Sequence, residues 1–269
     1  MTESETPASG GSIQTRVEHG IGWIVIDNQL RRNAISGAMF RAIIDAIAAY
    51  EADDSVRIVI LRGAGSLAFS AGADLKEVGA PDRTPEQVQT FEDAFAGALK
   101  AVEACAKPTM AMIQGFWIGG GAALAICCDI RIAADDSCFA VTPAKIGLAF
   151  DYEGTKRIVD LAGPAFAKEI LMTARQFSAE ECAAMGLVNK VVRKPDLEMV
   201  VTDYARKIAA NAPLAVSAAK RAVNAVMQDQ AAKDLSEVEA AVAAARDSED
   251  AEEARQAIQE KRPPRFAGR

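Results

Sequence analysis

The sequence predicts an α/β core followed by a helical C-terminal subdomain. A strand, a glycine loop and a helix follow one another twice in the first half of the chain, an alternation that is typical of α/β folds. From Gly154 onward helical patterns dominate, with one more short strand expected at 188–192. We therefore expect a disordered tail at residues 1–12, the α/β core at 13–200 and a helical subdomain at 201–269.

Composition excludes several classes of protein. The 269 residues are 50% apolar and 25% charged, which is ordinary for a globular chain. A net charge of -7 offers no attraction to nucleic acid or to an anionic membrane surface. Five cysteines without CxxC spacing, and the single histidine His19, suggest neither a disulfide framework nor a metal site. We expect a cytoplasmic protein with reduced thiols and no nucleic-acid, membrane or metal partner.

The first elements follow from periodicity. Residues 13–18 and 22–27 are β-rich and are joined by a glycine turn, which predicts a hairpin. Ser36 is a good N-cap for a helix at 37–52, where apolar residues recur every three or four positions. The nearly continuous apolar run at 56–61 predicts a strand that is buried on both faces.

The same signals define the middle and the end of the chain. The elements expected next are a glycine loop at 63–74, a linker at 80–86, a helix at 86–105, a strand at 109–113, a second glycine loop at 114–121, a helix to about residue 128, and strands near 129–133 and 138–142. Alanine-rich helices expected around 213–228 and 232–246 offer shallow apolar faces for close packing, within one subunit or between subunits.

Two glycine corners are the main candidates for chemistry, and each follows an apolar strand. In the segment 69–76, small residues let a ligand approach main-chain N–H groups, and Asp74 can cap the next helix. In the segment 115–122, three glycines open a helix, where unpaired N–H groups favour negative charge. Brought together, the corners would form an oxyanion hole; taken singly, each is also typical of a plain tight turn. Neither fits a dinucleotide or P-loop motif.

Taken in order along the chain, the motifs resemble those of the crotonase, or enoyl-CoA hydratase/isomerase, superfamily. The resemblance extends from about residue 13 to 269. It rests on Arg32-Asn33-Ala34-Ile35, on Phe69-Ser70-Ala71-Gly72-Ala73-Asp74-Leu75-Lys76, on Gly119-Gly120-Gly121 leading to Cys128-Asp129, on the stretch 139–148, and on Glu260-Lys261-Arg262-Pro263.

The resemblance implies a fold, a substrate and an assembly. The fold is a spiral of ββα repeats with a helical trimerisation region, and the assembly is a homotrimer or a dimer of trimers. The substrate is an acyl-CoA thioester, so coenzyme A enters with the substrate and no separate cofactor is expected. The main-chain N–H groups of Ala73 and Gly120 are implied to polarise the thioester carbonyl and stabilise an enolate.

The resemblance also assigns residues to the coenzyme. Ala34 and Ala71 are implied to line the adenine site, and Arg32, Lys76 and Lys261 to bind the phosphates. The alternative for the three cations is that each is an ordinary solvated surface charge.

Five further positions have assignments with a structural alternative or a structural role. Asp74 is a candidate both for substrate binding and for helix capping, and Asp129 is expected to be structural. Trp117, together with Phe116, is a candidate wall of the acyl pocket, although aromatics in an apolar run can equally be core. Pro143 is a further candidate for substrate binding.

The chain departs from the family at the two glutamates with which hydratases hold and activate water. Ala123 and Pro143 occupy these positions, and neither can transfer a proton. If each carboxylate contributes roughly 10²–10⁴ as an acid or base, losing both costs about 10⁴–10⁸ in hydration rate.

Two acidic residues could replace the missing pair. Asp151 aligns with a loop position where some dienoyl-CoA isomerases and a dehalogenase of the family place a working aspartate, and Glu153 is the second candidate. One carboxylate beside an oxyanion hole can shift a double bond by moving a proton between two carbons. Helix capping is the structural alternative for both acids. We therefore expect double-bond isomerisation or a related enolate reaction.

Three alternatives stay open. Hydration could persist despite the replacements. The tripeptide Thr142-Pro143-Ala144 also resembles that of family decarboxylases, which act on malonyl-type thioesters and need no glutamate pair. A catalytically silent acyl-CoA-binding protein would keep the oxyanion hole alone.

Overall fold

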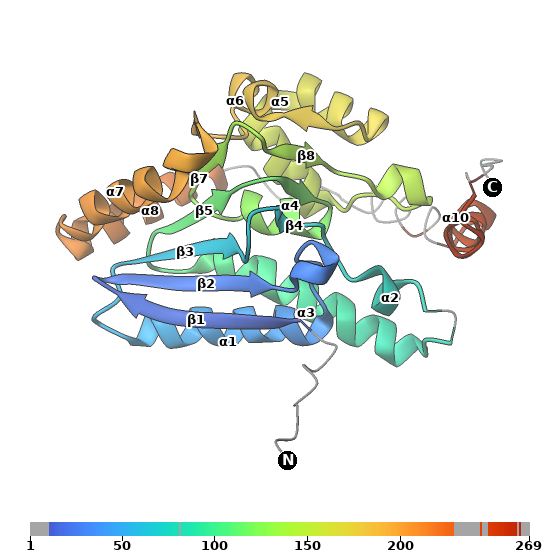
Figure 1. The fold of residues 1–269 in the computed structure, drawn as a ribbon, viewed down its shortest axis with the longest axis horizontal. Helices are drawn as coiled ribbons and strands as arrows, with labels where there is room; N and C mark the ends of the chain where they lie inside the picture. The colour runs from blue at the N-terminus through green and yellow to red at the C-terminus, as the bar shows by residue number, and fades with distance from the viewer. Residues whose placement is uncertain (1–10, 81, 229–242, 244–246, 263, 265–269) are drawn as a thin grey trace, which may run out of the picture.

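The computed structural model describes residues 11–80, 82–228, 243, 247–262 and 264 (Figure 1). Its larger sheet has six strands, in the order β1 (Ser12–Glu18), β2 (Ile21–Asp27), β3 (Ile58–Gly63), β5 (Thr109–Ile113), β7 (Ile130–Ala134) and β10 (Lys190–Val192). The first two strands form an antiparallel hairpin, and every later pairing in this sheet is parallel.

A smaller sheet lies beside it and is built from short strands. Its order is β4 (Ala68–Ser70), β6 (Phe116–Ile118), β8 (Cys138–Ala140) and β9 (Phe177–Ser178). The first three strands are parallel, and β9 pairs antiparallel with β8. Because β4 and β6 run parallel, the two glycine corners that follow them leave the same edge of this sheet.

Helices cover both faces of the larger sheet and extend beyond it (Figure 1). The helices are α1 (Gly37–Ala52), α2 (Leu75–Val78), α3 (Pro85–Ala104), α4 (Gly120–Ile126), α5 (Tyr152–Thr173), α6 (Ala179–Ala184), α7 (Leu197–Ala209), α8 (Pro213–Gln228) and α10 (Glu249–Glu260), with 3-10 turns η1 (Gln29–Arg31), η2 (Pro143–Ile146) and η3 (Lys194–Asp196). Among the described helices, none is both long enough and apolar enough to cross a bilayer.

Alternation along the central strands divides the core into two clusters. Val59 and Leu61 of β3 belong to a cluster that includes the apolar stripes of α1 and α3. Ile58 and Ile60 point to the other face and pack in a second cluster with Val201 and its neighbours on α7. Successive side chains of a strand point to opposite faces, so a strand without polar positions must be covered on both.

Local signals account for where the helices begin. The Ser36 hydroxyl accepts a hydrogen bond from Met39 N at 3.3 Å and starts α1 where the sequence predicts it. Thr84 and Gln87 form a reciprocal capping box at the start of α3, with Pro85 at its first position. Such caps satisfy N–H groups that the helix itself leaves unpaired.

Asp129 has the structural role expected of it. Its carboxylate accepts hydrogen bonds from the backbone N and the hydroxyl of Thr109, at 2.7 and 3.0 Å. The same carboxylate forms an ion pair of 2.8 Å with Lys220 of α8, whose side chain is only 9% exposed. This pair joins the C-terminal helices to the β5–β7 part of the core.

Several predicted elements are confirmed at their predicted bounds, and others are corrected. The helices at 37–52 and 213–228 and the strand at 109–113 agree with the prediction. The strand predicted at 56–61 lies at Ile58–Gly63 instead, because Val56 N closes a turn on Asp53 O. The N-terminal tail was predicted to run to residue 12, but Ser12 already pairs in β1.

The smaller sheet is the main feature that periodicity does not predict. β4 and β6 lie inside segments predicted to be glycine loops, and β9 was not predicted at all. Strands of two or three residues are too short to show alternation, and they form through pairing partners far away in the sequence. Most of the helix predicted at 232–246 lies outside the described residues.

Candidate active site

The two glycine corners meet, as the sequence analysis predicts. A Cβ atom built on Gly120 would lie 3.3 Å from the amide nitrogen of Ala73. A Cβ atom on Gly72 would lie 3.2 Å from the amide nitrogen of Gly120 and 2.9 Å from Ile118 O. Gly72 has φ +101°, a conformation that favours glycine. Glycine is therefore required here both by backbone conformation and by the close approach of the two chains.

Two N–H groups at this meeting point have no partner in the described part of the chain. Three neighbouring amides have partners: Gly72 N donates to a serine hydroxyl, and Asp74 N and Gly119 N donate to carbonyls. Ala73 N donates to no described group, and Gly120 N is the first amide of α4, which has no acceptor within the helix. Both residues are partly exposed. Two converging free donors at a helix start are what an oxyanion hole requires.

A buried hydrogen-bond chain holds the first corner in place. The Ser70 hydroxyl, which is fully buried, donates to Asn33 O at 2.7 Å and accepts from Gly72 N at 3.1 Å. The Asn33 side chain donates to Ala64 O and Ala68 O at 2.9 and 2.8 Å. Asn33 has φ +58°, so these bonds fix a backbone conformation that is uncommon outside glycine. Sequence reasoning missed both roles, because neither side chain is itself a reactive group.

Asp74 serves structure at the same corner. Its carboxylate caps α2 by accepting from Lys76 N at 3.0 Å, and it forms an ion pair with Arg31. Residue 74 is almost fully buried, whereas Lys76 is exposed. The capping role is confirmed, and only 11% of the Asp74 side chain is exposed.

The two positions at which the family resemblance leads us to expect glutamates are apolar in this structure. Ala123 lies on α4, one turn after Gly120, and is 7% exposed. Pro143 begins the turn η2 and is partly exposed. Neither position has a group that could hold or activate water.

Asp151 and Glu153 lie at the start of α5. The Asp151 carboxylate accepts from Gly154 N at 2.7 Å and so caps the helix, and both acidic side chains are exposed. The charge of Asp151 also reaches the Cys127 thiol at the end of α4, where burial is the main cause that raises the thiol pKa to about 12. The capping alternative is thus realised for Asp151, and its carboxylate retains an oxygen for a second partner.

A pocket of about 240 Å³ opens beside the first corner. It is lined by Arg32, Ala71, Phe116, Ile118, Ala140, Thr142, Lys145 and Gln176. The Arg32 guanidinium stacks over the Phe116 ring at 4.9 Å. Two of the residues predicted to bind coenzyme A, Arg32 and Ala71, therefore lie in one pocket. Ala34 does not line this pocket; it is buried, and its carbonyl accepts from Asn28 Nδ2 at 2.8 Å.

The pocket also contains residues that sequence reasoning did not single out. Lys145 and Gln176 come from η2 and from the segment before β9, and only the fold brings them to Arg32. Trp117, by contrast, is fully buried and packs on Phe139 with ring centroids 4.5 Å apart. Alternation along β6 explains the difference, because Phe116 and Ile118 face the pocket and Trp117 faces the core.

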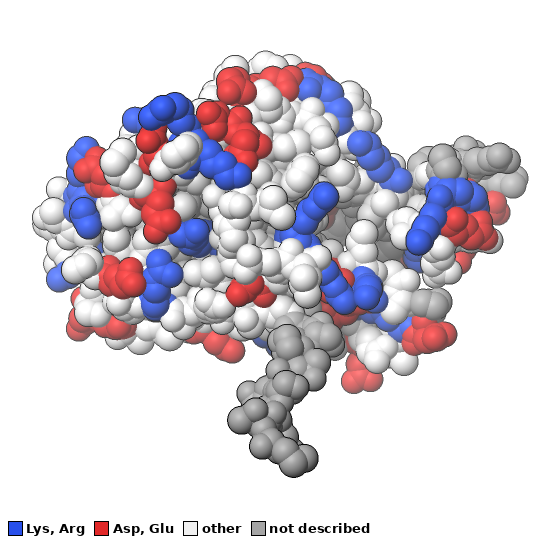
Figure 2. Space-filling view, viewed as in Figure 1, with Lys and Arg blue, Asp and Glu red and all other residues white. Residues whose placement is uncertain are grey.

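The last candidate cation lies at the end of α10. Lys261 is exposed and forms the left-handed C-cap of this helix. Helix α10 packs on the turn after η2, where a Cβ on Gly147 would lie 2.7 Å from Asp250 O. Figure 2 shows Lys and Arg side chains on both sides of the region between α10 and the body of the molecule. On the rest of that face, acidic and basic side chains are mixed.

Comparisons with known proteins agree with this geometry. The enoyl-CoA hydratase/isomerase family matches residues 16–269, and the chain belongs to that family. A short-chain-enoyl-CoA hydratase of Clostridium acetobutylicum is 34% identical over 216 residues, which are 78% of this chain and 80% of the relative.

Solved structures confirm the crotonase fold. An enoyl-CoA hydratase/carnithine racemase from Magnetospirillum magneticum is 36% identical, covers 96% of each chain and has a TM-score of 0.77. A methylmalonyl-CoA decarboxylase in complex with 2-nitronate-propionyl-CoA is 27% identical, covers 96% of this chain and 99% of its own, and has a TM-score of 0.87. Members of the family are thus named for more than one reaction.

Proposed function

We propose that this protein is an acyl-CoA enzyme that holds a thioester enolate between the N–H groups of Ala73 and Gly120. The observation that carries the proposal is the convergence of these two donors without a partner among the described residues. Donors placed in advance where charge develops stabilise a transition state without reorganisation, and removing one donor typically costs about 10²–10³ in kcat. Coenzyme A belongs to the substrate in this proposal, and no separate cofactor takes part.

Binding of the coenzyme is assigned to the pocket beside Arg32 and to the cations around it. Arg32, Lys76 and Lys261 would bind phosphate oxygens, while Ala34 and Ala71 leave room for the adenine. Lys145, which lines the same pocket as Arg32, is a fourth candidate cation. A protein with a net charge of -7 can still bind a polyanion when cations are gathered locally. A homotrimer or a dimer of trimers, located in the cytoplasm, is part of the same proposal.

The first reaction that we propose is double-bond isomerisation. Asp151 would take a proton from the carbon next to the thioester carbonyl, and the electron pair would pass to the carbonyl oxygen in the hole. Return of the proton to the far carbon of the former double bond completes the shift. Glu153, two residues further along at the start of the same helix, is the alternative base. Both acids are exposed in the free chain, so substrate binding would have to bring the base and the α-carbon together.

Decarboxylation of a malonyl-type thioester is the second candidate, and one observation favours it. The decarboxylase complex superposes with the higher TM-score, 0.87 against 0.77 for the hydratase-type neighbour. In this reaction the bond to the carboxylate breaks, CO₂ leaves, and the electron pair forms the enolate directly. Apolar groups such as Ala123 and Pro143 would favour release of CO₂ by desolvating the carboxylate.

A substrate panel tests the proposal and separates the two reactions. The purified protein would be given 3-butenoyl-CoA, crotonyl-CoA and methylmalonyl-CoA, and products would be separated by chromatography. Isomerisation predicts crotonyl-CoA from 3-butenoyl-CoA, with a loss of at least about 10²-fold in Asp151→Asn. Decarboxylation predicts propionyl-CoA that forms equally well in that variant. Asp203→Asn, on the exposed face of α7, is the matched control. Binding of acyl-CoA without turnover of any substrate would leave only a silent binding protein and refute the enzymatic proposal.

A further inference from the structure

One aromatic side chain stands directly beside the two free N–H groups. Cε2 of Phe95, on α3, lies 3.3 Å from the point where a Cβ of Gly120 would be. The amide nitrogen of Ala73 lies at the same distance from that point. Phe95 is partly exposed and packs against the core, and Cε2 is the atom of its ring that lies next to Gly120. An acyl chain that leaves the hole toward α3 therefore meets this ring first.

The ring of Phe95 is held by other aromatic rings. Phe40, which is fully buried on α1, meets it edge to face with centroids 5.2 Å apart and planes at 71°. Phe91, one turn earlier on α3, makes a second edge-to-face contact with Phe40 at 5.9 Å and 84°. Edge-to-face packing is the geometry that aromatic pairs prefer. Phe95 cannot turn away from the hole without losing its contact with a ring that is itself fixed.

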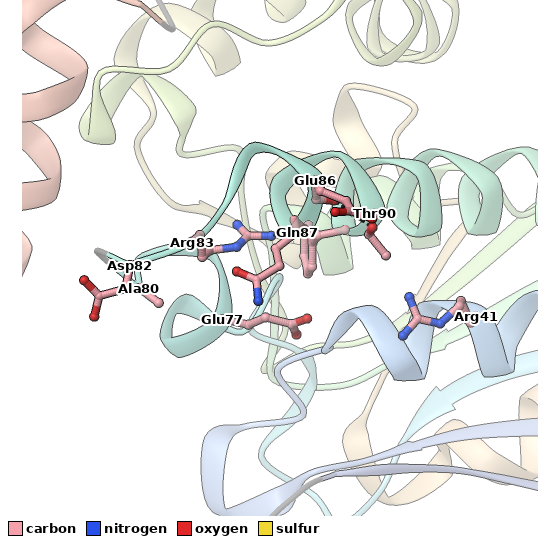
Figure 3. Close-up of a pocket in the computed structure, with 9 residues that line it drawn as sticks. Arg41, Glu77, Ala80, Asp82, Arg83, Glu86, Gln87 and Thr90 are labelled. Carbon is pink, nitrogen blue, oxygen red and sulfur yellow. Dashed lines mark hydrogen bonds between the residues drawn. The ribbon is translucent and has the colours of Figure 1, made fainter.

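Next to these aromatic rings the protein has a recess with a polar and charged lining. A recess of about 460 Å³ lies between the start of α1, α2 and the first turns of α3 (Figure 3). Its lining is mostly charged or polar, and it includes Arg41, Glu77, Arg83 and Gln87, whose side chains Figure 3 shows around the opening. Phe91 closes the recess on the inner side, with the Arg83 guanidinium 5.4 Å from its ring centroid. An apolar acyl chain that extended past these rings would enter a recess lined mostly by charged and polar side chains.

We propose that Phe95 limits the enzyme to short-chain acyl-CoA thioesters. The inference rests on the proposed function, because it assumes that the thioester carbonyl binds at Ala73 and Gly120. Each methylene that is buried adds about fourfold to affinity, and this gain requires apolar space. Phe95 occupies that space in the direction of α3, so affinity stops rising once the chain reaches the ring.

Direct binding of unreactive thioesters tests the inference. Dissociation constants of butyryl-, hexanoyl- and octanoyl-CoA would be measured by titration calorimetry for the wild type, Phe95→Ala, Phe95→Leu and Phe166→Ala. Phe166 is a partly exposed phenylalanine on α5 and serves as the matched control. Phe95→Leu keeps apolar packing on Phe40 and provides a second variant in case the alanine variant unfolds. The wild type should bind all three thioesters with similar affinity or bind the longer ones more weakly.

The Phe95 variants should change how affinity depends on acyl-chain length. With the ring removed, two added methylenes should raise affinity about 15-fold from butyryl- to hexanoyl-CoA, and the leucine variant should show a smaller rise. The inference is overturned if wild-type affinity climbs through octanoyl-CoA, or if Phe95→Ala shows the same profile as Phe166→Ala. Failure of the wild type to bind any of the three thioesters would refute the proposed function itself. If the wild type binds butyryl-CoA but Phe95→Ala leaves the dependence of affinity on chain length unchanged, only the role of Phe95 is refuted.

Discussion

Removing the Ser70 hydroxyl should damage both the stability of the protein and the geometry of the oxyanion hole. This hydroxyl is buried, and it joins Asn33 O to Gly72 N through bonds of 2.7 and 3.1 Å. Gly72 is the residue before Ala73, whose N–H is one of the two proposed donors. Ser70→Ala leaves one carbonyl and one amide without a partner.

The magnitude follows from these two groups. A buried polar group left unsatisfied costs about 1–3 kcal/mol, so the free energy of unfolding should fall by about 2–6 kcal/mol. A water molecule in the place of the hydroxyl would give the lower end of that range. The Ala73 amide stays in the chain but loses its support, and a displacement near 1 Å can cost about 10² in kcat. Because the hole acts mainly on the transition state, KM should change much less than kcat.

Denaturant unfolding and steady-state kinetics on the best substrate of the panel measure the two effects. Ser66→Ala is the control, because this serine lies four residues earlier and is exposed. The reasoning is refuted if Ser70→Ala keeps wild-type kcat while losing stability, since the hydroxyl would then support the fold without positioning the hole. It is equally refuted if neither quantity changes relative to Ser66→Ala.

Three further predictions follow from buried contacts. Gly121→Ala should separate the two corners and lower kcat by about 10² or more, because a Cβ there would lie 2.6 Å from Cβ of Ser70. Lys220→Met should lower the free energy of unfolding by about 1–3 kcal/mol, since Asp129 then loses its cation while the apolar stem is kept. The thiols of Cys127 and Cys182 should not react with Ellman's reagent in the native protein at pH 8, because burial raises the pKa of each to about 12 and leaves the thiol protonated.

Each of these predictions has a control or a refuting outcome. Gly97→Ala should be tolerated, because its Cβ meets only the flexible end of Ile44; a Gly121→Ala protein that is as active as Gly97→Ala would contradict the close approach of the corners. Lys207→Met, which breaks an exposed pair, should change stability by less than about 1 kcal/mol. An equally small loss in Lys220→Met would contradict the contribution expected from its buried lysine. Rapid labelling of two or more thiols in the native protein would contradict their burial, since Cys138 alone is partly exposed among the five.

The parts of the fold that the sequence predicts are those with local signals. The Ser36 cap and the regular stripe of apolar residues define α1, and an apolar run of strand length defines β5. The strands β4 and β6 have no such signal, because three residues are too few to show alternation and their partners are distant in the sequence. The smaller sheet, which aligns the two corners, could therefore be recognised only in three dimensions.

The candidate site divides in the same way. The small residues at the two strand ends mark places where backbone N–H groups are open, and the family resemblance singles out Ala73 and Gly120 among them. The orientation of Phe116 and Trp117 could not, since both are aromatic and the register of β6 decides which one faces the pocket. Lys145 and Phe95 reach the site from elements that are distant in the sequence. No local pattern marks either residue as part of the site.

Hydration of crotonyl-CoA by the purified protein tests the central claim most directly. The claim is that the oxyanion hole works here without the two carboxylates that hydratases use, because Ala123 and Pro143 stand in their places. Loss of the enoyl-thioester absorbance should then be at least about 10⁴-fold slower than with a hydratase that has both carboxylates, while the same preparation converts 3-butenoyl-CoA or methylmalonyl-CoA. Crotonyl-CoA hydration at the rate of an ordinary hydratase would contradict the account, because other groups would then have to activate the water.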